Sequence, residues 1–150
     1  MRQATCHQIA LIRAAPVAFS VGLERPAAPS RKLAAFLKEH FALGSDDVVL
    51  SSVTSRHSAA GCTSVQDTVL YREPDGLKAG QVWAHVAVRG TALTLVQQLR
   101  QLEHDRSEGT AVWSIEDAYE FVETRTILDA VIWCRVGDDM IRTLMPRDLQ

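Results

Sequence analysis

The chain has 150 residues, of which 47% are hydrophobic and 23% charged, and 16 basic against 18 acidic residues give a formal net charge of −2. This length and composition are typical of one folded domain and exclude bulk disorder. The near balance of charge removes the field that drives nonspecific binding to phosphate backbones, so nucleic acid is not a favoured partner.

Residues 1–29 carry the weakest signals of regular structure. The apolar residues within 8–14 predict an edge strand at most, and the segment 24–29 is rich in proline and alanine, which is typical of a connector. We therefore divide the chain into an N-terminal segment, residues 1–29, and a single domain over residues 30–150.

A helix is predicted over about residues 30–43. Leu33, Leu37 and Phe41 recur at helical spacing, so they form one apolar face. Gly44 stands just beyond them, where a helix commonly ends in a left-handed residue.

Three strands are predicted to follow this helix. Residues 48–54 are rich in β-branched side chains, and residues 55–64 are small or polar and predict a loop. The second strand covers residues 68–72 and ends at the turn formed by residues 73–76. The third strand, residues 81–89, shows the clearest pattern.

A second helix is predicted to begin after Gly90. Leu95, Leu99 and Leu102 form an apolar stripe at helical spacing, and charged residues follow them. Gly109 is expected to end this helix.

The C-terminal third is predicted to contain a strand over residues 110–114, a short helix and a hairpin. The segment 114–117 fits a helix-capping box, and residues 119–127 predict a helical turn or two that gives way to extended chain. Two apolar runs, residues 130–136 and 140–145, flank a glycine-first turn and predict antiparallel strands. The expected fold class is therefore α+β, with a mainly antiparallel sheet of about five to six strands and two principal helices.

Strand alternation assembles one candidate binding surface. Side chains of one strand that are two residues apart share a face of a sheet, so aromatic and basic residues from three strands can be combined. The residues of this predicted surface are Tyr71, Trp83, His85, Arg89, Trp133 and Arg135. Such a surface suits a planar ligand, an anion or a protein partner. The competing interpretation is that the tryptophans belong to a core.

A second candidate site lies in the predicted loop at residues 55–64. Thiol catalysis needs a cysteine whose proton is removed by a nearby base, so Cys62 with His57 or His85 forms a conceivable pair. The same three residues are conceivable zinc ligands, but their spacing lacks the paired short intervals of zinc sites, and we predict no metal. The alternative for Cys62 is an ordinary packed thiol.

The cysteines also bear on the compartment of the protein. Cys6, Cys62 and Cys134 are odd in number and widely spaced, which does not suit a disulfide framework and favours a reducing compartment. With no secretory signal or membrane-spanning segment in the sequence pattern, we expect a soluble cytoplasmic protein.

The predicted function is non-catalytic binding of a small molecule or a protein partner by a sheet face or cavity. One alternative is a small thiol- or metal-dependent enzyme centred on Cys62, His57 and His85. A second alternative is a homodimer formed through an exposed sheet edge or apolar face. No cofactor is assigned from the sequence.

Overall fold

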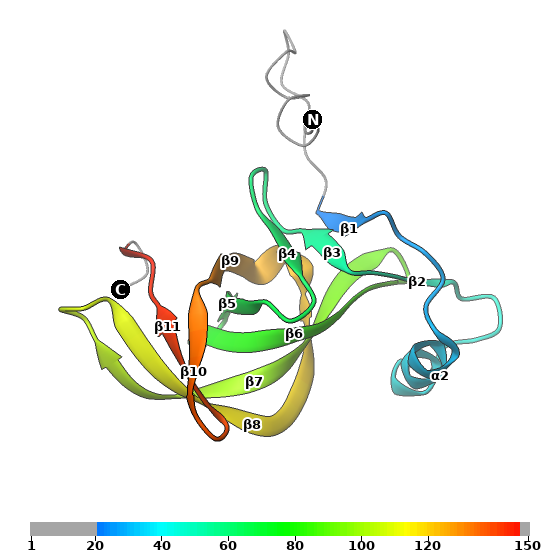
Figure 1. Cartoon of the computed structure of the whole chain (residues 1–150). Helices are drawn as coiled ribbons and strands as arrows, with labels where there is room; N and C mark the ends of the chain where they lie inside the picture. Colours follow the sequence, from blue (N-terminus) through cyan, green and yellow to red (C-terminus); the bar gives the residue numbers. More distant parts are fainter. Residues whose placement is uncertain (1–20, 148–150) are drawn as a thin grey trace, which may run out of the picture.

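The computed structural model describes residues 21–147, and its single chain folds mainly into β-strands (Figure 1). In chain order the elements are β1 (Gly22–Glu24), α2 (Arg31–His40), β2 (Val49–Ser52), β3 (Thr54–Arg56), β4 (Cys62–Ser64), β5 (Thr68–Glu73), β6 (Gly76–Val88), β7 (Thr91–Asp105), β8 (Thr110–Glu123), η1 (Thr124–Thr126), β9 (Ile127–Val131), β10 (Trp133–Gly137) and β11 (Met140–Leu144). The predicted edge strand at residues 8–14 lies outside the described residues.

The predicted α+β class with two principal helices and five to six strands is wrong. Within residues 21–147 the structure has one α-helix, and most of the chain belongs to an antiparallel sheet of eight strands. A separate three-stranded sheet pairs β1, β3 and β4 in the order β1-β3-β4. The protein is therefore mostly β.

The large sheet curls into a half-barrel (Figure 1). Its strand order is β10-β11-β8-β7-β6-β5-β9, and β2 pairs with the C-terminal part of β6. The two strands at the ends of this order, β9 and β10, are consecutive in the chain and are separated by Ile132 alone. The chain itself thus joins the two edges of the curled sheet.

The predicted second helix is instead the strand β7. Arg89 and Gly90 both have positive φ, 51° and 80°, as the two central residues of a tight hairpin turn do when its twist matches the flanking strands. This turn folds β7 back onto β6, and the two strands pair from Val88↔Thr91 to Ala79↔Leu99. Long-range pairing outweighs the helical spacing of the leucines, because propensity is a weak preference that tertiary contacts override.

The prediction of a short helix at residues 114–117 is also wrong, because these residues belong to the strand β8. Ser114 lies opposite Met140 of β11 and Arg100 of β7, so it is inside the sheet between two neighbouring strands. The Ser114 hydroxyl donates to Glu116 Oε2 at 3.0 Å, a bond between side chains rather than a helix cap. The segment 119–127 is correspondingly strand followed by the single turn η1.

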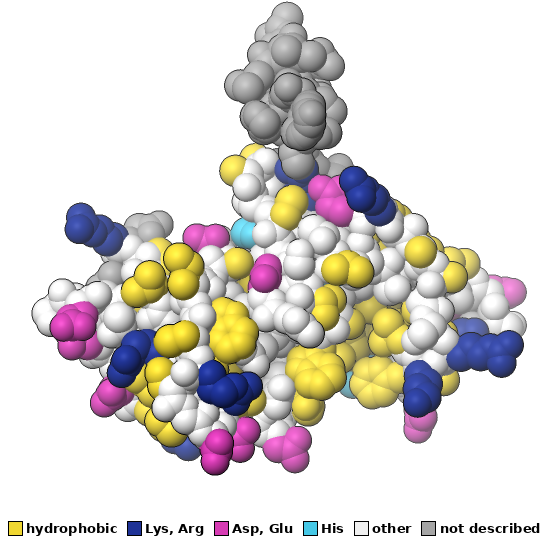
Figure 2. All heavy atoms as spheres, in the orientation of Figure 1, with side chains coloured by type: hydrophobic (Ala, Val, Ile, Leu, Met, Phe, Trp, Pro, Cys, Tyr) yellow, Lys and Arg dark blue, Asp and Glu magenta, His cyan; other side chains and the backbone are white. Residues whose placement is uncertain are grey.

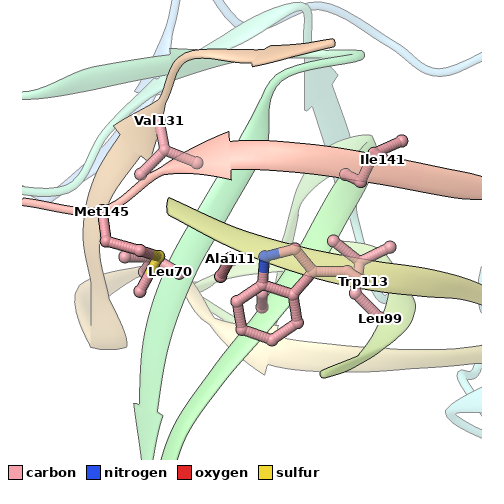
Figure 3. Close-up of a cluster of buried hydrophobic side chains, with 8 residues drawn as sticks. Leu70, Leu99, Ala111, Trp113, Val131, Ile141 and Met145 are labelled. Carbon is pink, nitrogen blue, oxygen red and sulfur yellow. The ribbon is translucent and has the colours of Figure 1, made fainter. Parts of the chain in front are cut away.

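One face of the curled sheet encloses a core around Trp113 (Figure 3). Trp113 of β8 is 3% exposed, and its indole Nε1 donates to Thr143 Oγ1 at 2.9 Å. Leu70, Ile141 and Met145 pack beside it, from β5, β11 and the chain just after β11. A second buried cluster, which includes Val69, Tyr71, Val82, Val96, Val122 and Ile127, contains the neighbouring side chains of β5 and so lies on its opposite face.

The helix α2 lies where the sequence predicts it, and it covers one end of the sheet. The Ser30 hydroxyl caps its first turn by accepting from the Leu33 backbone N–H at 3.2 Å. Leu37 is fully buried against Val49, Val86 and Val88 of β2 and β6. Within residues 21–147, no helix has the length and apolar character needed to cross a membrane.

Candidate functional site

A groove of about 490 Å³ opens between β10 and the strands β6, β7 and β8. Trp83 of β6 and Trp133 of β10 supply its aromatic surface. Its polar groups are the side chains of Gln66, Gln81, Gln97, Arg135 and Asp139. A concave site with aromatic walls and a few polar groups is the usual form of a small-molecule pocket.

Trp83 reaches the groove because it is the extra residue of a β-bulge. Val82 pairs with Val96 and Ala84 pairs with Leu95. Between these two pairs β6 therefore moves on by two residues and β7 by only one. A bulge of this kind leaves the extra residue outside the regular ladder and redirects its side chain. The Trp83 side chain is 54% exposed, which is unusual for so large an apolar group.

Gln97 holds the Trp83 ring in place. The indole Nε1 of Trp83 donates to Gln97 Oε1 at 3.1 Å, and Gln97 Nε2 donates to the backbone oxygen of Glu116 at 2.9 Å. The Trp83 ring also meets the Tyr119 ring edge to face, with centroids 5.4 Å apart. These contacts fix an exposed aromatic ring in one orientation.

Two further irregularities of the sheet lie at the groove. Between Gln97 and Leu99 the pairing of β7 with β8 shifts, and between Arg135 and Gly137 the pairing of β10 with β11 shifts. Gln66, in the turn between β4 and β5, has a φ of 82°, a left-handed conformation that glycine adopts more readily. Departures from regular geometry concentrate at functional sites, because there they aim particular side chains.

The strand β10 leaves the groove open along one edge. It pairs with β11 on one side, and no strand among residues 21–147 pairs with its other side. All five of its residues are exposed. Apolar side chains gather on the face that carries β10, with basic side chains among them (Figure 2).

The structure brings together three of the six residues of the predicted binding surface. Trp83, Trp133 and Arg135 line the groove. Tyr71, His85 and Arg89 lie elsewhere, so the six residues do not form one surface.

The bulge at Trp83 separates it from His85, which the alternation rule places on the same face. Trp83 bonds to Gln97, whereas His85 Nδ1 lies 3.0 Å from Thr94 Oγ1. Thr94 and Gln97 are three residues apart on β7 and therefore point to opposite faces. The single extra residue moves His85 to the buried face.

His85 is fully buried in a network of hydroxyl groups. Its Nε2 lies 3.4 Å from Thr63 Oγ1, and Thr94 Oγ1 lies 2.9 Å from Thr124 Oγ1. Burial lowers the pKa of His85 to about 4, since the charged ring loses its hydration there. At neutral pH this histidine is an uncharged, hydrogen-bonded core residue.

Tyr71 and Arg89 have separate structural partners. Tyr71 is fully buried, and its hydroxyl donates to Glu120 Oε1 at 2.9 Å. Burial and the Glu120 carboxylate raise the pKa of Tyr71 far above its ordinary value. Arg89 stands in the turn between β6 and β7 and pairs with Asp47 at 3.5 Å.

The residues of the predicted thiol or metal enzyme occupy both faces of β4. Cys62 is exposed, with Sγ 4.0 Å from Glu24 Oε1, while its neighbour Thr63 points the other way and meets His85. His57 is buried against Gly61, and burial lowers its pKa. Among residues 21–147, no three His, Cys, Asp or Glu side chains lie together as metal ligands.

Sequence reasoning missed the polar residues of the groove. Gln97 falls within the predicted second helix, where its alignment with Trp83 is not visible. Asp139 is assigned to the hairpin turn alone, and Gln66 to a connection between strands. Gly90 is a weak signal for the β6–β7 hairpin, because arginine is not a residue typical of the first turn position. The hairpin alone would not have placed Gln97 beside Trp83, since that contact depends on the bulge.

No family model, curated protein or solved structure matches this chain.

Proposed function

We propose that this protein binds a small planar molecule in the groove between Trp83 and Trp133. The observation that carries this proposal is the placement of Trp83. A β-bulge turns this side chain outward, and Gln97 and Tyr119 then hold it half exposed over the groove. A ring fixed in this way loses little conformational freedom on binding a ligand, so its stacking energy contributes directly to affinity.

The dimensions and polar groups of the groove support a small molecule over a protein partner. Its volume of about 490 Å³ lies within the range of small-molecule pockets. Three glutamine side chains line it. Gln97 is bonded to Trp83 and Glu116, so the amide groups of Gln66 and Gln81 are the ones that orient a ligand between the rings. None of the three residues of the predicted thiol enzyme, Cys62, His57 and His85, lines this groove, and the role we propose for it is binding.

The experiment that tests this proposal uses indole as a planar probe and isothermal titration calorimetry as the readout. Trp83→Ala is expected to weaken indole binding by about tenfold or more, because stacking on one ring contributes about 1–3 kcal/mol. Phe36→Ala is the matched control, because Phe36 of α2 is a comparably exposed aromatic residue, 47% against 54%, outside the groove. Equal indole affinity of the Trp83→Ala variant and the wild type would refute the proposal.

A further inference from the structure

The groove holds one positive and one negative side chain that do not neutralise each other. Arg135 lies on β10, and Asp139 lies four residues later in the turn to β11. Both line the groove, and neither belongs to any ion pair within 4.0 Å among residues 21–147. The groove therefore offers two separate opposite charges to a ligand.

The backbone fixes the positions of these two residues beside the groove. The pairing of β10 with β11 shifts just after Arg135, where Val136 is the extra residue. Asp139 has a φ of 54°, and its backbone oxygen accepts from the Ile115 N–H of β8 at 2.8 Å. Ile115 itself lines the groove, so this bond ties the turn that carries Asp139 to the groove wall.

The charge balance decides which kind of ligand fits. A planar anion is attracted by Arg135 but repelled by Asp139, and a planar cation meets the reverse pair of forces. A molecule with both charges gains from each residue. A guanidinium also binds a carboxylate through two parallel hydrogen bonds, which adds orientation to the attraction.

We infer that the ligand of the groove is a zwitterion that carries a planar ring, with the ring between Trp83 and Trp133, the anionic group at Arg135 and the cationic group at Asp139. An aromatic amino acid or a similar small molecule has this chemistry. The inference rests on the proposed function, since the ring must first occupy the groove.

Four probes that share the indole ring separate the contributions of the ring, the anionic group and the cationic group to the affinity. They are indole, which is uncharged, indole-3-propionate, which is an anion, tryptamine, which is a cation, and free tryptophan, which carries both charges. Free tryptophan is expected to bind about tenfold or more tighter than indole, while each singly charged probe binds within about threefold of indole.

Two variants, each with a matched control, test whether Arg135 binds the anionic group of the ligand and Asp139 the cationic group. Arg135→Gln should remove the advantage of free tryptophan over tryptamine, and Asp139→Asn should remove its advantage over indole-3-propionate. Arg142→Gln on β11 and Asp138→Asn in the same turn are the controls, because neither residue lines the groove. Asparagine tolerates a positive φ, so the Asp139→Asn variant retains the turn.

The outcomes distinguish this inference from the proposed function. If indole binds and free tryptophan binds no tighter, or if its advantage survives in both variants, the inference is overturned and the proposed function stands. If none of the four probes binds at millimolar concentration, both are overturned. Loss of the advantage in Arg135→Gln and Asp139→Asn, with both controls unchanged, supports the inference.

Discussion

Trp83 and His85 lie two residues apart on β6, yet they differ in exposure and in the partners that surround them. His85 is fully buried, and both of its ring nitrogens lie near threonine hydroxyl groups. Trp83 is half exposed over a groove whose charged groups have no ion-pair partner within residues 21–147. The first arrangement meets its own hydrogen-bonding needs, whereas the second leaves groups for another molecule to satisfy.

The two residues differ in what a ligand could add to each of them. A buried histidine with two hydroxyl neighbours stabilises the fold and gains nothing from a ligand. An exposed ring that the protein fixes in place costs free energy in water and recovers it when a ligand covers it. Changes at His85 should therefore act on stability, and changes around Trp83 should act on binding.

The largest expected effect is on stability at His85. Replacing His85 with Ala should lower the free energy of unfolding by about 3 kcal/mol, because it creates a cavity and leaves buried threonine hydroxyls without a partner. Urea unfolding at pH 7 measures this change. Trp83→Ala should cost about 1 kcal/mol or less in the same assay. Equal losses in the two variants would remove the distinction between the two sites.

The pH dependence of stability should show the same burial. The folded-state pKa of His85, about 4, lies below its unfolded value of 6.5, so the unfolded chain binds the proton more strongly. This contribution to stability is complete above pH 6.5 and is lost as the pH falls toward 4. Between pH 7 and pH 5 the wild type should lose about 2 kcal/mol from this source. His57, whose pKa burial also lowers, acts in the same direction.

A variant isolates the share of His85 in that loss. His85→Gln has no titrating ring, so urea unfolding of the two proteins at pH 7 and pH 5 should show a smaller decrease for the variant. Carboxylates far from His85 titrate in both proteins and cancel in the difference. The electrostatic effect of His57 on His85 remains in it and belongs to the share of His85. An identical decrease in both would mean that His85 is not buried in its neutral form.

A small effect on stability is expected at Gln97. Replacing Gln97 with Met keeps the shape of the side chain but removes both hydrogen bonds that connect Trp83 to the backbone of Glu116. The free energy of unfolding should fall by about 0.5–1 kcal/mol. Indole affinity should fall severalfold, because the Trp83 ring is no longer held in one orientation. Unchanged affinity in calorimetry would show that Gln97 does not position the ring.

Much of the local structure is predictable from the sequence, but the fold class is not. The helix near Leu37, the strand that begins at Thr68 and the hairpin around Gly137 follow from spacing and turn chemistry, and the structure confirms them. The strand β7 is not predictable from spacing, because its leucines recur at helical spacing and only pairing with β6 and β8 makes the segment extended. Pairing between distant segments is not visible in a local pattern.

The groove was predictable only in part, because the face on which a side chain lies depends on how its strand pairs with the next. Trp83, Trp133 and Arg135 stand out as aromatic and basic residues on strands, and the structure places them together. Their grouping with His85 assumes unbroken alternation along β6, and one bulged residue reverses the faces beyond it. Tyr71 does not belong with them, because it is fully buried on another face. Bulges depend on how two strands align, so they leave little trace in one strand alone.

The groove between Trp83 and Trp133 is proposed to bind a planar ligand, and the three tryptophans of the chain allow a direct test. Each indole N–H gives its own signal in a nitrogen–proton correlation spectrum, and Trp113 is an internal control because it is buried in the core. Titration with indole should shift the signals of Trp83 and Trp133 together, with one saturation curve, and leave Trp113 in place. If Trp83 and Trp133 do not move, or if all three signals shift alike, the groove is not the binding site.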